Sequence, residues 1–583
     1  MKLIFCYMRR RDKLLCLAVI GLIVVQVLLE TWIPTQMSQI TTMLQTGGST
    51  YDAVLKIGLQ MIMSAVGAFI CACCAGFLIS TIGCGCCESI RSALYKKVIG
   101  LSSADVTSFG ASTLIVRCTN DVSYVQSFLE DCLQPLVQAP ILLAAVFLRM
   151  SFSNSAWRGL WITAIVVLAI LLLYISLASL IYVKKSGILR DKVASYSREH
   201  VYGIRVVHAF NAEKPYGDEY EAANKEMSKI FAKSRKIIAS FSPVVTTLLY
   251  GMSVAVYVIG LSIITSSAPT ERVQVYSDMV AYVSYMGLLI TALVNIVMII
   301  LYTPMIIYAD MRLFAVLGKP DGIPEGERTE GEAEKDGEIE FSHVSFRYPG
   351  TKEDAVRDVS FRIKKGQTAA IIGGTGSGKT TLLNLIPRLY DAGAGEVLVN
   401  GVNVKDYKLN ALRDRIGYVP QTNYLFSGTV RSNIGFGDKN CAFSDEQIAH
   451  AAKIGQAEEF ISKKEGGFDA QVTTAGSNFS GGQKQRISIA RAICRDPKFY
   501  IFDDSFSALD FKTDRALRRA LKENAGEATV LIVGQRVSTI RNADLIIVMD
   551  KGEVVGKGRH DELMEQCSVY RELALSQEGG SKA

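Results

Sequence analysis

Charged side chains are scarce in this sequence. Asp, Glu, Lys and Arg make up 20% of its 583 residues, whereas hydrophobic residues make up 49%. The mean hydropathy is +0.24, which argues against an ordinary water-soluble protein. Residues 14–55 contain neither Lys nor Arg. This deficit of charge indicates that part of the chain lies in a lipid bilayer.

The hydrophobic residues are concentrated in the first half of the chain. Six stretches there are long enough to cross a bilayer as a helix, which needs roughly 20 residues. They are residues 14–33, 57–82, 133–152, 159–183, 244–266 and 279–307. The first is too long for a cleaved signal peptide, and no small-residue cleavage site follows it. We therefore expect six transmembrane helices in the cell membrane.

The distribution of basic residues predicts the orientation of these helices. Five basic residues precede residue 14, and twelve lie between Lys184 and Lys236. Because Lys and Arg are enriched on the cytoplasmic side, both termini are predicted to be cytoplasmic. This bias explains the net charge of +7, so we predict no nucleic-acid partner.

Three segments are predicted along the chain: a transmembrane domain at 1–316, a linker at 317–337 and a cytoplasmic domain at 338–583. The connections 83–132 and 184–243 have helical periodicity, so the membrane helices are expected to extend into the cytoplasm. The linker is rich in Gly, Pro and Glu. After it, short apolar runs alternate with helical stretches, which is typical of an α/β domain.

A glycine-rich turn in the α/β domain predicts a nucleotide site. The stretch TAAIIGGTGSGKTTLLNLI runs from an expected strand into an expected helix and contains G-x-x-x-x-G-K-[ST]. Glycines let backbone N–H groups approach phosphate oxygens, and the helix N-terminus adds the positive end of its dipole. Lys379 is expected to reach the β and γ phosphates of ATP, and Thr380 to hold Mg²⁺. The predicted nucleotide-binding residues are Gly373, Gly374, Thr375, Gly376, Ser377, Gly378, Lys379, Thr380 and Thr381.

A second motif points to a family. NFSGGQKQRISIARAI, at residues 478–493, is followed closely by FYIFDDSFSALD, at residues 499–510. This order resembles the ATP-binding cassette (ABC) ATPases. Six spans, long cytoplasmic helices, a linker and one cassette together resemble a half-transporter of the exporter type. The resemblance covers the whole chain.

The resemblance implies roles for further residues. Tyr348 in FRYPG resembles the aromatic residue that stacks on adenine, and Gln421 in YVPQTNYLFSGTV resembles the glutamine that contacts Mg²⁺. Asp503 resembles the carboxylate behind Mg²⁺, and residues 507–510 resemble the loop that crosses to the partner cassette. The signature residues, which in this family bind the ATP held by the opposite cassette, are Ser480, Gly481, Gly482 and Gln483.

Two positions depart from the family pattern. Asp504 stands where the family has the glutamate that orients or deprotonates the attacking water. Its side chain is shorter by one methylene, roughly 1 Å, and such a misplacement can cost on the order of 10²-fold in rate. Gln535 stands where the family has a histidine, and an amide has no titratable proton. The five histidines of the chain offer no obvious replacement.

These departures predict a slow ATP site within a heterodimer. On this interpretation the chain exports hydrophobic or amphipathic compounds together with a second half-transporter, and its signature completes a competent site on that partner. The pattern resembles bacterial heterodimeric multidrug exporters. A homodimeric exporter, a lipid or peptide exporter, and a regulatory half with little turnover are the alternatives. The short N-terminal segment disfavours a peptide exporter with its own peptidase.

The predicted spans contain few polar side chains that could contact a substrate or membrane lipid. Four of them are candidates for substrate contacts: Glu30, Gln134, Gln138 and Asn295. Glu30 could instead be an interfacial acid that faces external water, and the other three could hydrogen-bond between helices. Six cysteines fall within residues 71–87. Pairs one helical turn apart could bind a soft metal, but cysteine is also a small hydrophobic residue that helices tolerate. The resemblance also implies coupling segments at 107–125 and 201–216.

Overall fold

The computed structural model describes residues 2–46, 50–150, 155–268, 271–320, 322–437, 443–524 and 526–579. They form two compact units. The first comprises residues 1–99 and 111–320, and the second comprises residues 100–110 and 321–583. Each unit is described by itself below.

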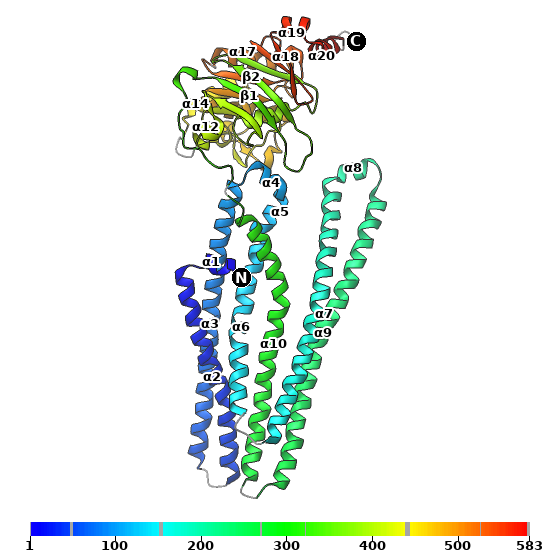
Figure 1. Cartoon of the computed structure of the whole chain (residues 1–583). Coiled ribbons are helices and arrows are strands. Elements are labelled where there is room, and N and C mark those ends of the chain that lie inside the picture. The colour runs from blue at the N-terminus through cyan, green and yellow to red at the C-terminus, as the bar shows by residue number, and fades with distance from the viewer. Residues whose placement is uncertain are drawn as a thin grey trace. The chain divides into compact units, whose positions relative to one another are not determined.

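The first unit is built from long helices (Figure 1). They are α2 (Arg10–Thr46), α3 (Tyr51–Gly100), α6 (Val122–Met150), α7 (Ser155–Tyr202), α9 (Glu213–Ser266) and α10 (Arg272–Leu317). The shorter helices are α1 (Lys2–Tyr7), α5 (Ala111–Val116), a π-turn (Arg117–Asp121) and α8 (Ile204–Ala209). Five long helices, counted over the described residues, are long and apolar enough to cross a membrane. The remaining long helix, α7, contains the fourth predicted span, 159–183. The membrane-helical fold is thereby confirmed.

Helix α10 holds the first unit together. It packs against α6, α2 and α9, and α7 packs against α9. Polar side chains join α2 to α10, since Thr42 Oγ1 donates to Ser277 Oγ at 2.8 Å and Tyr285 OH donates to Thr31 O at 3.2 Å. Thr31 and Tyr285 lie within predicted spans, where hydrocarbon offers no competing partner, so their bond helps to fix the pairing of the two helices.

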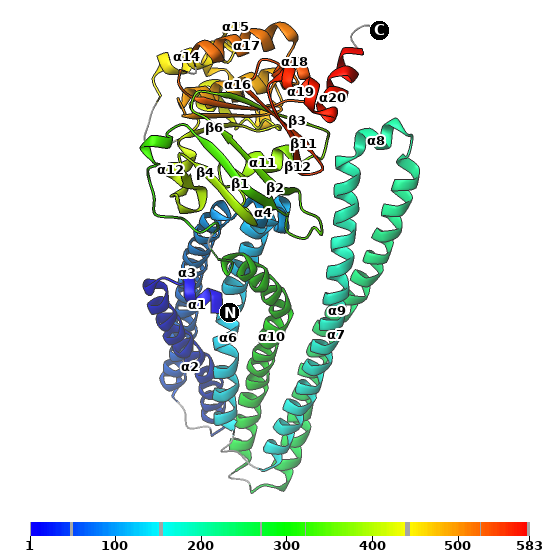
Figure 2. The same ribbon diagram turned by 45° about the horizontal axis from the view of Figure 1, so that its top comes forward.

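The second unit is an α/β domain with two main sheets (Figure 2). Its strands are β1 (Ile339–Phe346), β2 (Val356–Ile363), β3 (Thr368–Gly373), β4 (Ala394–Val399), β5 (Val402–Asn403), β6 (Ile416–Val419), β7 (Gly428–Thr429), β8 (Gln471–Val472), β9 (Phe499–Asp503), β10 (Thr529–Val533), β11 (Leu545–Asp550) and β12 (Glu553–Gly558). Its helices are α4 (Ser103–Phe109), α11 (Lys379–Leu385), α12 (Leu409–Arg413), α13 (Val430–Ile434), α14 (Asp445–Ile454), α15 (Glu458–Ser462), α16 (Gly481–Cys494), α17 (Phe511–Asn524), α18 (Val537–Ile540), α19 (His560–Gln566) and α20 (Ser568–Gly579). The second unit therefore includes α4 in addition to the predicted cassette residues.

The order of strands in the larger sheet brings four loops together. The order is β12-β11-β3-β10-β9-β6. Strands β11, β3, β10, β9 and β6 run parallel to one another, whereas β12 pairs antiparallel with β11. Every residue of β9 and β10 is buried, as expected for parallel strands covered on both faces. The loops that follow β3, β10, β9 and β6 consequently meet at one edge of the sheet, where ligands of open α/β sheets bind.

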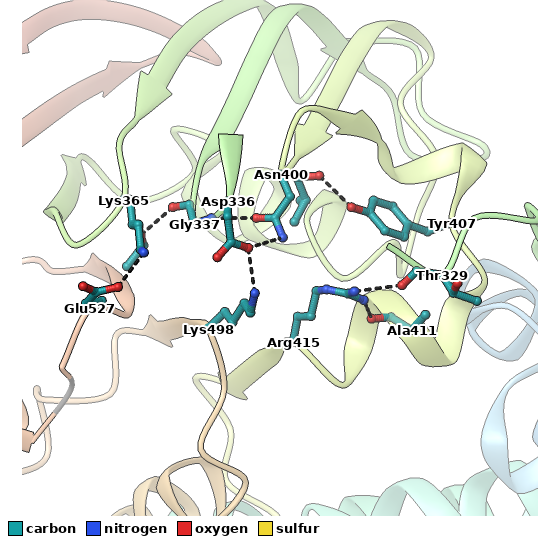
Figure 3. Close-up of polar contacts among 12 residues, drawn as sticks. Thr329, Asp336, Gly337, Lys365, Asn400, Tyr407, Ala411, Arg415, Lys498 and Glu527 are labelled. Carbon is teal, nitrogen blue, oxygen red and sulfur yellow. Dashed lines mark hydrogen bonds and ion pairs between the residues drawn. The ribbon is translucent and has the colours of Figure 1, made fainter. Parts of the chain in front are cut away.

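The segment that enters β1 is fixed to the second unit by polar contacts (Figure 3). Asn400 is central, because its Oδ1 accepts from the Gly337 N–H at 2.9 Å and its Nδ2 donates to Asp336 Oδ1 at 3.2 Å. Lys498 Nζ pairs with the same Asp336 oxygen at 2.7 Å. Arg415 NH2 donates to the Thr329 carbonyl at 2.8 Å. The linker residues that precede β1 are thus bonded to other residues of the second unit.

Substitution of Asn400 is expected to loosen this attachment. Asn400 is 2% exposed and has a φ of 51°, a left-handed conformation that Asn tolerates better than Ala. We predict that Asn400→Ala lowers the free energy of local opening at β1 by about 2 kcal/mol, because one buried and one partly buried hydrogen bond are lost. Hydrogen–deuterium exchange of the β1 amides in the purified full chain measures this. Lys405→Ala is the surface control, and equal exchange in both variants would contradict the assignment.

Candidate nucleotide site

The phosphate-binding loop between β3 and α11 is closed by its own lysine. Lys379 Nζ donates to the carbonyl oxygens of Gly374 at 2.7 Å and Gly373 at 3.0 Å. Gly376 and Gly378 have φ values of 81° and 95°, which side chains rarely adopt. Burial lowers the pKa of Lys379, while the nearby Asp504 and Asp503 raise it. The ammonium group therefore lies where incoming phosphate oxygens can replace the two carbonyl acceptors.

Asp503, the last residue of β9, lies beside the loop with one oxygen unpaired. Its Oδ1 accepts from Thr380 Oγ1 at 3.1 Å. Its Oδ2 is buried and has no hydrogen-bond partner within the described residues. Burial is the main cause that raises the pKa of Asp503, and the adjacent Asp504 adds to it. A buried, unpaired carboxylate oxygen next to a threonine hydroxyl fits a hard cation such as Mg²⁺.

The next residue, Asp504, is held by two glutamine amides. Gln535 Nε2 donates to Asp504 Oδ2 at 2.8 Å, and Gln421 Nε2 donates to the same oxygen at 3.3 Å. The backbone of Asp504 is left-handed, with a φ of 49°, a conformation that short Asp side chains tolerate comparatively well. The two residues that depart from the family pattern thus contact each other. Neither amide can exchange a proton with the carboxylate at ordinary pH.

Gln577 on α20 fixes the loop that carries Gln535, and no sequence motif predicts this role. Its Nε2 donates to the Gln535 carbonyl at 2.8 Å, and its Oε1 accepts from the Val537 N–H at 2.7 Å. One side-chain amide thus binds the backbone on both sides of Arg536. The 40-residue separation between Val537 and Gln577 explains why local sequence patterns could not reveal this contact.

Tyr348 lies near the phosphate-binding loop. Its OH is 3.1 Å from Thr381 Oγ1, and its ring makes edge contacts with Phe346 and Tyr390. The ring is half-buried, which leaves part of it available for contact. Its role in adenine binding remains a prediction.

The signature residues form the start of α16. Ser480 is the N-cap, its Oγ accepts from the Gln483 N–H at 3.3 Å, and the Gln483 side chain bonds back to the Ser480 N–H. A Cβ on Gly482 would lie 3.3 Å from the Ala508 carbonyl, so the signature packs against the loop 507–510. No hydrogen bond within the described parts of this chain joins the signature to Lys379 or Asp503. The predicted nucleotide-binding residues therefore form two separate groups in the structure. One comprises the glycine-rich loop and Asp503, and the other is the signature.

The polar side chains predicted in the membrane helices do not gather at one site. Glu30 accepts from Gln26 Nε2 at 2.8 Å on its own helix. Gln138 is buried, and Gln134 and Asn295 are half-buried. Sequence analysis missed Glu130 on α6, which accepts from Gln126 Nε2 at 3.0 Å and from Cys84 Sγ at 3.9 Å. Among the described residues, no group of three or more His, Cys, Asp or Glu has a metal-binding arrangement.

Both units match models of known protein families. The family model described as "ABC transporter" matches residues 356–507, and that described as "ABC transporter transmembrane region" matches residues 16–293. An uncharacterized ABC transporter ATP-binding protein of Mycobacterium tuberculosis is 34% identical over 558 residues, covering 95% of this chain and 94% of that protein. The ATP-dependent lipid A-core flippase of Pseudomonas aeruginosa is 31% identical over 529 residues, covering 90% and 84%.

A solved structure shows the same fold. The structure of a bacterial Atm1-family ABC exporter with ATP bound aligns with a TM-score of 0.80 and 21% sequence identity. The alignment covers 97% of this chain and 98% of that chain. At this identity the likeness establishes the fold alone.

Neutralising Asp503 is expected to stabilise the cassette when Mg²⁺ is absent. The raised pKa of Asp503 means that the folded state disfavours the charged carboxyl. The carboxylate therefore destabilises the folded state once the pH rises above the ordinary pKa of an aspartate. We predict that Asp503→Asn raises the calorimetric unfolding temperature at pH 7 without Mg²⁺ by about 2–4 °C. The same variant should lose the additional stabilisation by Mg-ATP. A lower Mg-free temperature with full Mg-ATP stabilisation would contradict the proposed cation site.

Removing the Gln577 side chain is expected to release the loop after β10. Because the Val537 N–H loses its acceptor, we predict that Gln577→Ala speeds hydrogen exchange of that amide by at least about tenfold. Ser576→Ala is the matched control, since Ser576 Oγ bonds only to Leu573 O on its own helix. Unchanged exchange at Val537 in Gln577→Ala would show that this contact does not hold the loop.

Proposed function

This chain belongs to the ABC transporter family and is a multi-pass membrane ATPase of the exporter type, and we propose that it is one half of a heterodimer whose own ATP site turns over slowly. The observation that carries the proposal is the contact between Asp504 and Gln535. The pair occupies the two positions that the family uses for hydrolysis, with a shorter acid and a neutral amide.

The proposal assigns each segment a part in the transport cycle. Residues 1–316 form the transmembrane domain, residues 317–337 the linker and residues 338–583 the cassette. Helix α10 ends at Leu317 and β1 begins at Ile339, which supports these boundaries. Closure of the cassettes on ATP would rock the helices as rigid bodies and alternate access to the two sides of the membrane.

ATP is proposed to bind with its phosphates against residues 373–381 and its adenine against Tyr348. Thr380, Gln421 and Asp503 would hold Mg²⁺, and the unpaired buried Oδ2 of Asp503 supports this assignment. The cation would neutralise charge on the phosphates. Lys379 would exchange its two carbonyl acceptors in the loop for phosphate oxygens.

Asp504 is proposed to be a weak substitute for the family's glutamate. Its carboxylate falls short by roughly 1 Å, a misplacement that can cost on the order of 10²-fold in rate. The two amides that donate to Oδ2 also occupy this oxygen and restrain it. Gln535 can hydrogen-bond a γ-phosphate, but it cannot shuttle a proton. The site is therefore built to bind ATP and is poorly equipped to activate water.

The signature has none of these departures and is proposed to serve the partner's ATP. Ser480 and Gly481 are exposed at the N-terminus of α16, where an approaching phosphate would meet backbone N–H groups. Exposed apolar side chains around α8 support assembly with a second half-transporter, since such patches mark interaction surfaces. Tyr202 is 84% exposed and Phe210 is 78% exposed.

The substrate class is proposed from the composition of the membrane helices. Their few polar groups are mostly engaged within or between helices, as with Glu30 and Gln26. A largely apolar path suits hydrophobic or amphipathic compounds, including lipids of the kind named for the P. aeruginosa relative. A regulatory half with little turnover is the second candidate, and the contact between Asp504 and the neutral Gln535 amide is the observation that favours it.

Replacing Asp504 and Gln535 by the residues of the family pattern is expected to speed ATP hydrolysis at this chain's site. The heterodimer is first given Ser480→Ala in this chain, which should silence the partner's site. In that background we predict that Asp504→Glu with Gln535→His raises Mg-ATP turnover by at least about tenfold, because the base is lengthened and a titratable group is supplied. Asp504→Glu alone is the matched control. Unchanged turnover in the double variant would refute the claim that these positions limit the site.

The relative effects of two single substitutions on ATP turnover distinguish the heterodimer from the homodimer. Ser480→Ala should reduce total turnover of the pair more than Asp504→Ala, because the signature serves the faster site. The reverse order would refute the assignment of the slow site to this chain.

A further inference from the structure

A cavity of about 460 Å³ lies between the N-terminal segment and α3 in the first unit. Arg9, Arg11 and Asp12 line one side, and residues of α3 between Phe77 and Glu88 line the other. Figure 1 shows the start of α2 alongside α3. The ATP site lies in the other unit, so its chemistry does not explain this cavity.

The cavity straddles the predicted cytoplasmic edge of the bilayer. The first predicted span begins at residue 14, three residues after Arg11, which corresponds to about 4.5 Å along a helix. The second predicted span ends at residue 82, so Phe77 lies inside it and Glu88 outside it. The interfacial zone of a bilayer is roughly 5–8 Å thick on each side. The charged residues of the cavity are therefore expected at the depth of lipid headgroups.

One of the two arginines in the cavity is already engaged. The Arg9 guanidinium pairs with Glu88 Oε2 at 3.0 Å, and its Nε donates to Ser89 Oγ at 3.2 Å. Arg11 lines the same cavity and is exposed. Its side chain makes no ion pair or hydrogen bond with any described residue. Arg11 is thus the cation available to a ligand.

Two carboxylates balance the charge of the cavity. Asp12 is 5% exposed, and its Oδ2 accepts from the Arg9 backbone N–H at 3.3 Å. Asp12 reaches α3 because Gly85 has no side chain, since a Cβ there would lie 3.4 Å from Asp12 Oδ2. Each carboxylate of Asp12 and Glu88 has lone pairs beyond those used by Arg9. A lining of two cations and two anions complements a zwitterion better than a simple anion.

We propose that this cavity binds the headgroup of a cytoplasmic-leaflet phospholipid that carries a phosphate and a primary ammonium group. Arg11 and the exposed Ser80 hydroxyl bind the phosphate, and Asp12 and Glu88 accept hydrogen bonds from the ammonium. The acyl chains continue along the lipid-facing side chains below the cavity. Phe77, Leu14 and Leu17 have exposed fractions of 76%, 67% and 66%. The lipid would tie the start of α2 to α3.

Lipid retention tests this site independently of ATP turnover. The purified transporter is reconstituted in nanodiscs of equal parts phosphatidylethanolamine, phosphatidylcholine and phosphatidylglycerol, then released in mild detergent for native mass spectrometry. We expect phosphatidylethanolamine to be retained about tenfold over phosphatidylcholine. Arg11→Ala should reduce this retention about tenfold, because a charge-assisted hydrogen bond is lost. Arg11→Lys should retain part of it.

Matched variants distinguish a site from general attraction to the membrane. Arg10→Ala removes the neighbouring exposed charge, which does not line the cavity, and should change retention less than twofold. Glu88→Gln makes the cavity more positive and should shift retention towards phosphatidylglycerol. Equal losses for Arg10→Ala and Arg11→Ala, or no preference for phosphatidylethanolamine in the unaltered protein, would overturn the proposal. An unchanged lipid preference in Glu88→Gln would overturn the assignment of the ammonium group.

Discussion

Two adjacent carboxylates at the end of one buried strand constrain the rest of the ATP site. The carboxylates of Asp503 and Asp504 both lie near Lys379, and like charges this close repel in a poorly solvated site. The left-handed backbone at Asp504 turns its carboxylate to the glutamines, while Asp503 stays beside Thr380. The parallel order β3-β10-β9-β6 then supplies each carboxylate with its neighbours. On the proposed assignment, Asp503 contributes to cation binding and Asp504 to water activation.

The proposed function rests on a contrast between two groups of residues in this chain. The loop after β3, Thr380 and Asp503 are complete as a binding site, whereas Asp504 is short and its neighbours are neutral amides. The signature at Ser480 is complete as well, and it forms a separate surface on α16. A chain with an intact signature and a weak base is best suited to pair with a different chain that carries a strong base. This contrast between the two sites is the basis on which we propose a heterodimer.

The sequence predicted what depends on local pattern. Long apolar runs predicted the membrane helices, and the glycine spacing predicted the loop between β3 and α11, because bilayer thickness and phosphate geometry impose fixed lengths. Contacts between distant residues were not predictable. Gln577 reaches the loop after β10 from a helix with no motif, and Arg11 and Glu88 line one cavity although they come from different helices, α2 and α3. The contact between Asp504 and Gln535 also required the strand order, although both departures were visible in the sequence.

The most direct test of the central claim compares this chain alone with this chain and the product of its genomic neighbour. Each sample is purified in detergent, and Mg-ATP hydrolysis is measured together with native mass. The account predicts that hydrolysis appears only in a one-to-one complex and that the chain alone binds ATP with little turnover. Robust hydrolysis by the chain alone, at the mass of a homodimer, would show that Asp504 is a working base and would contradict the account.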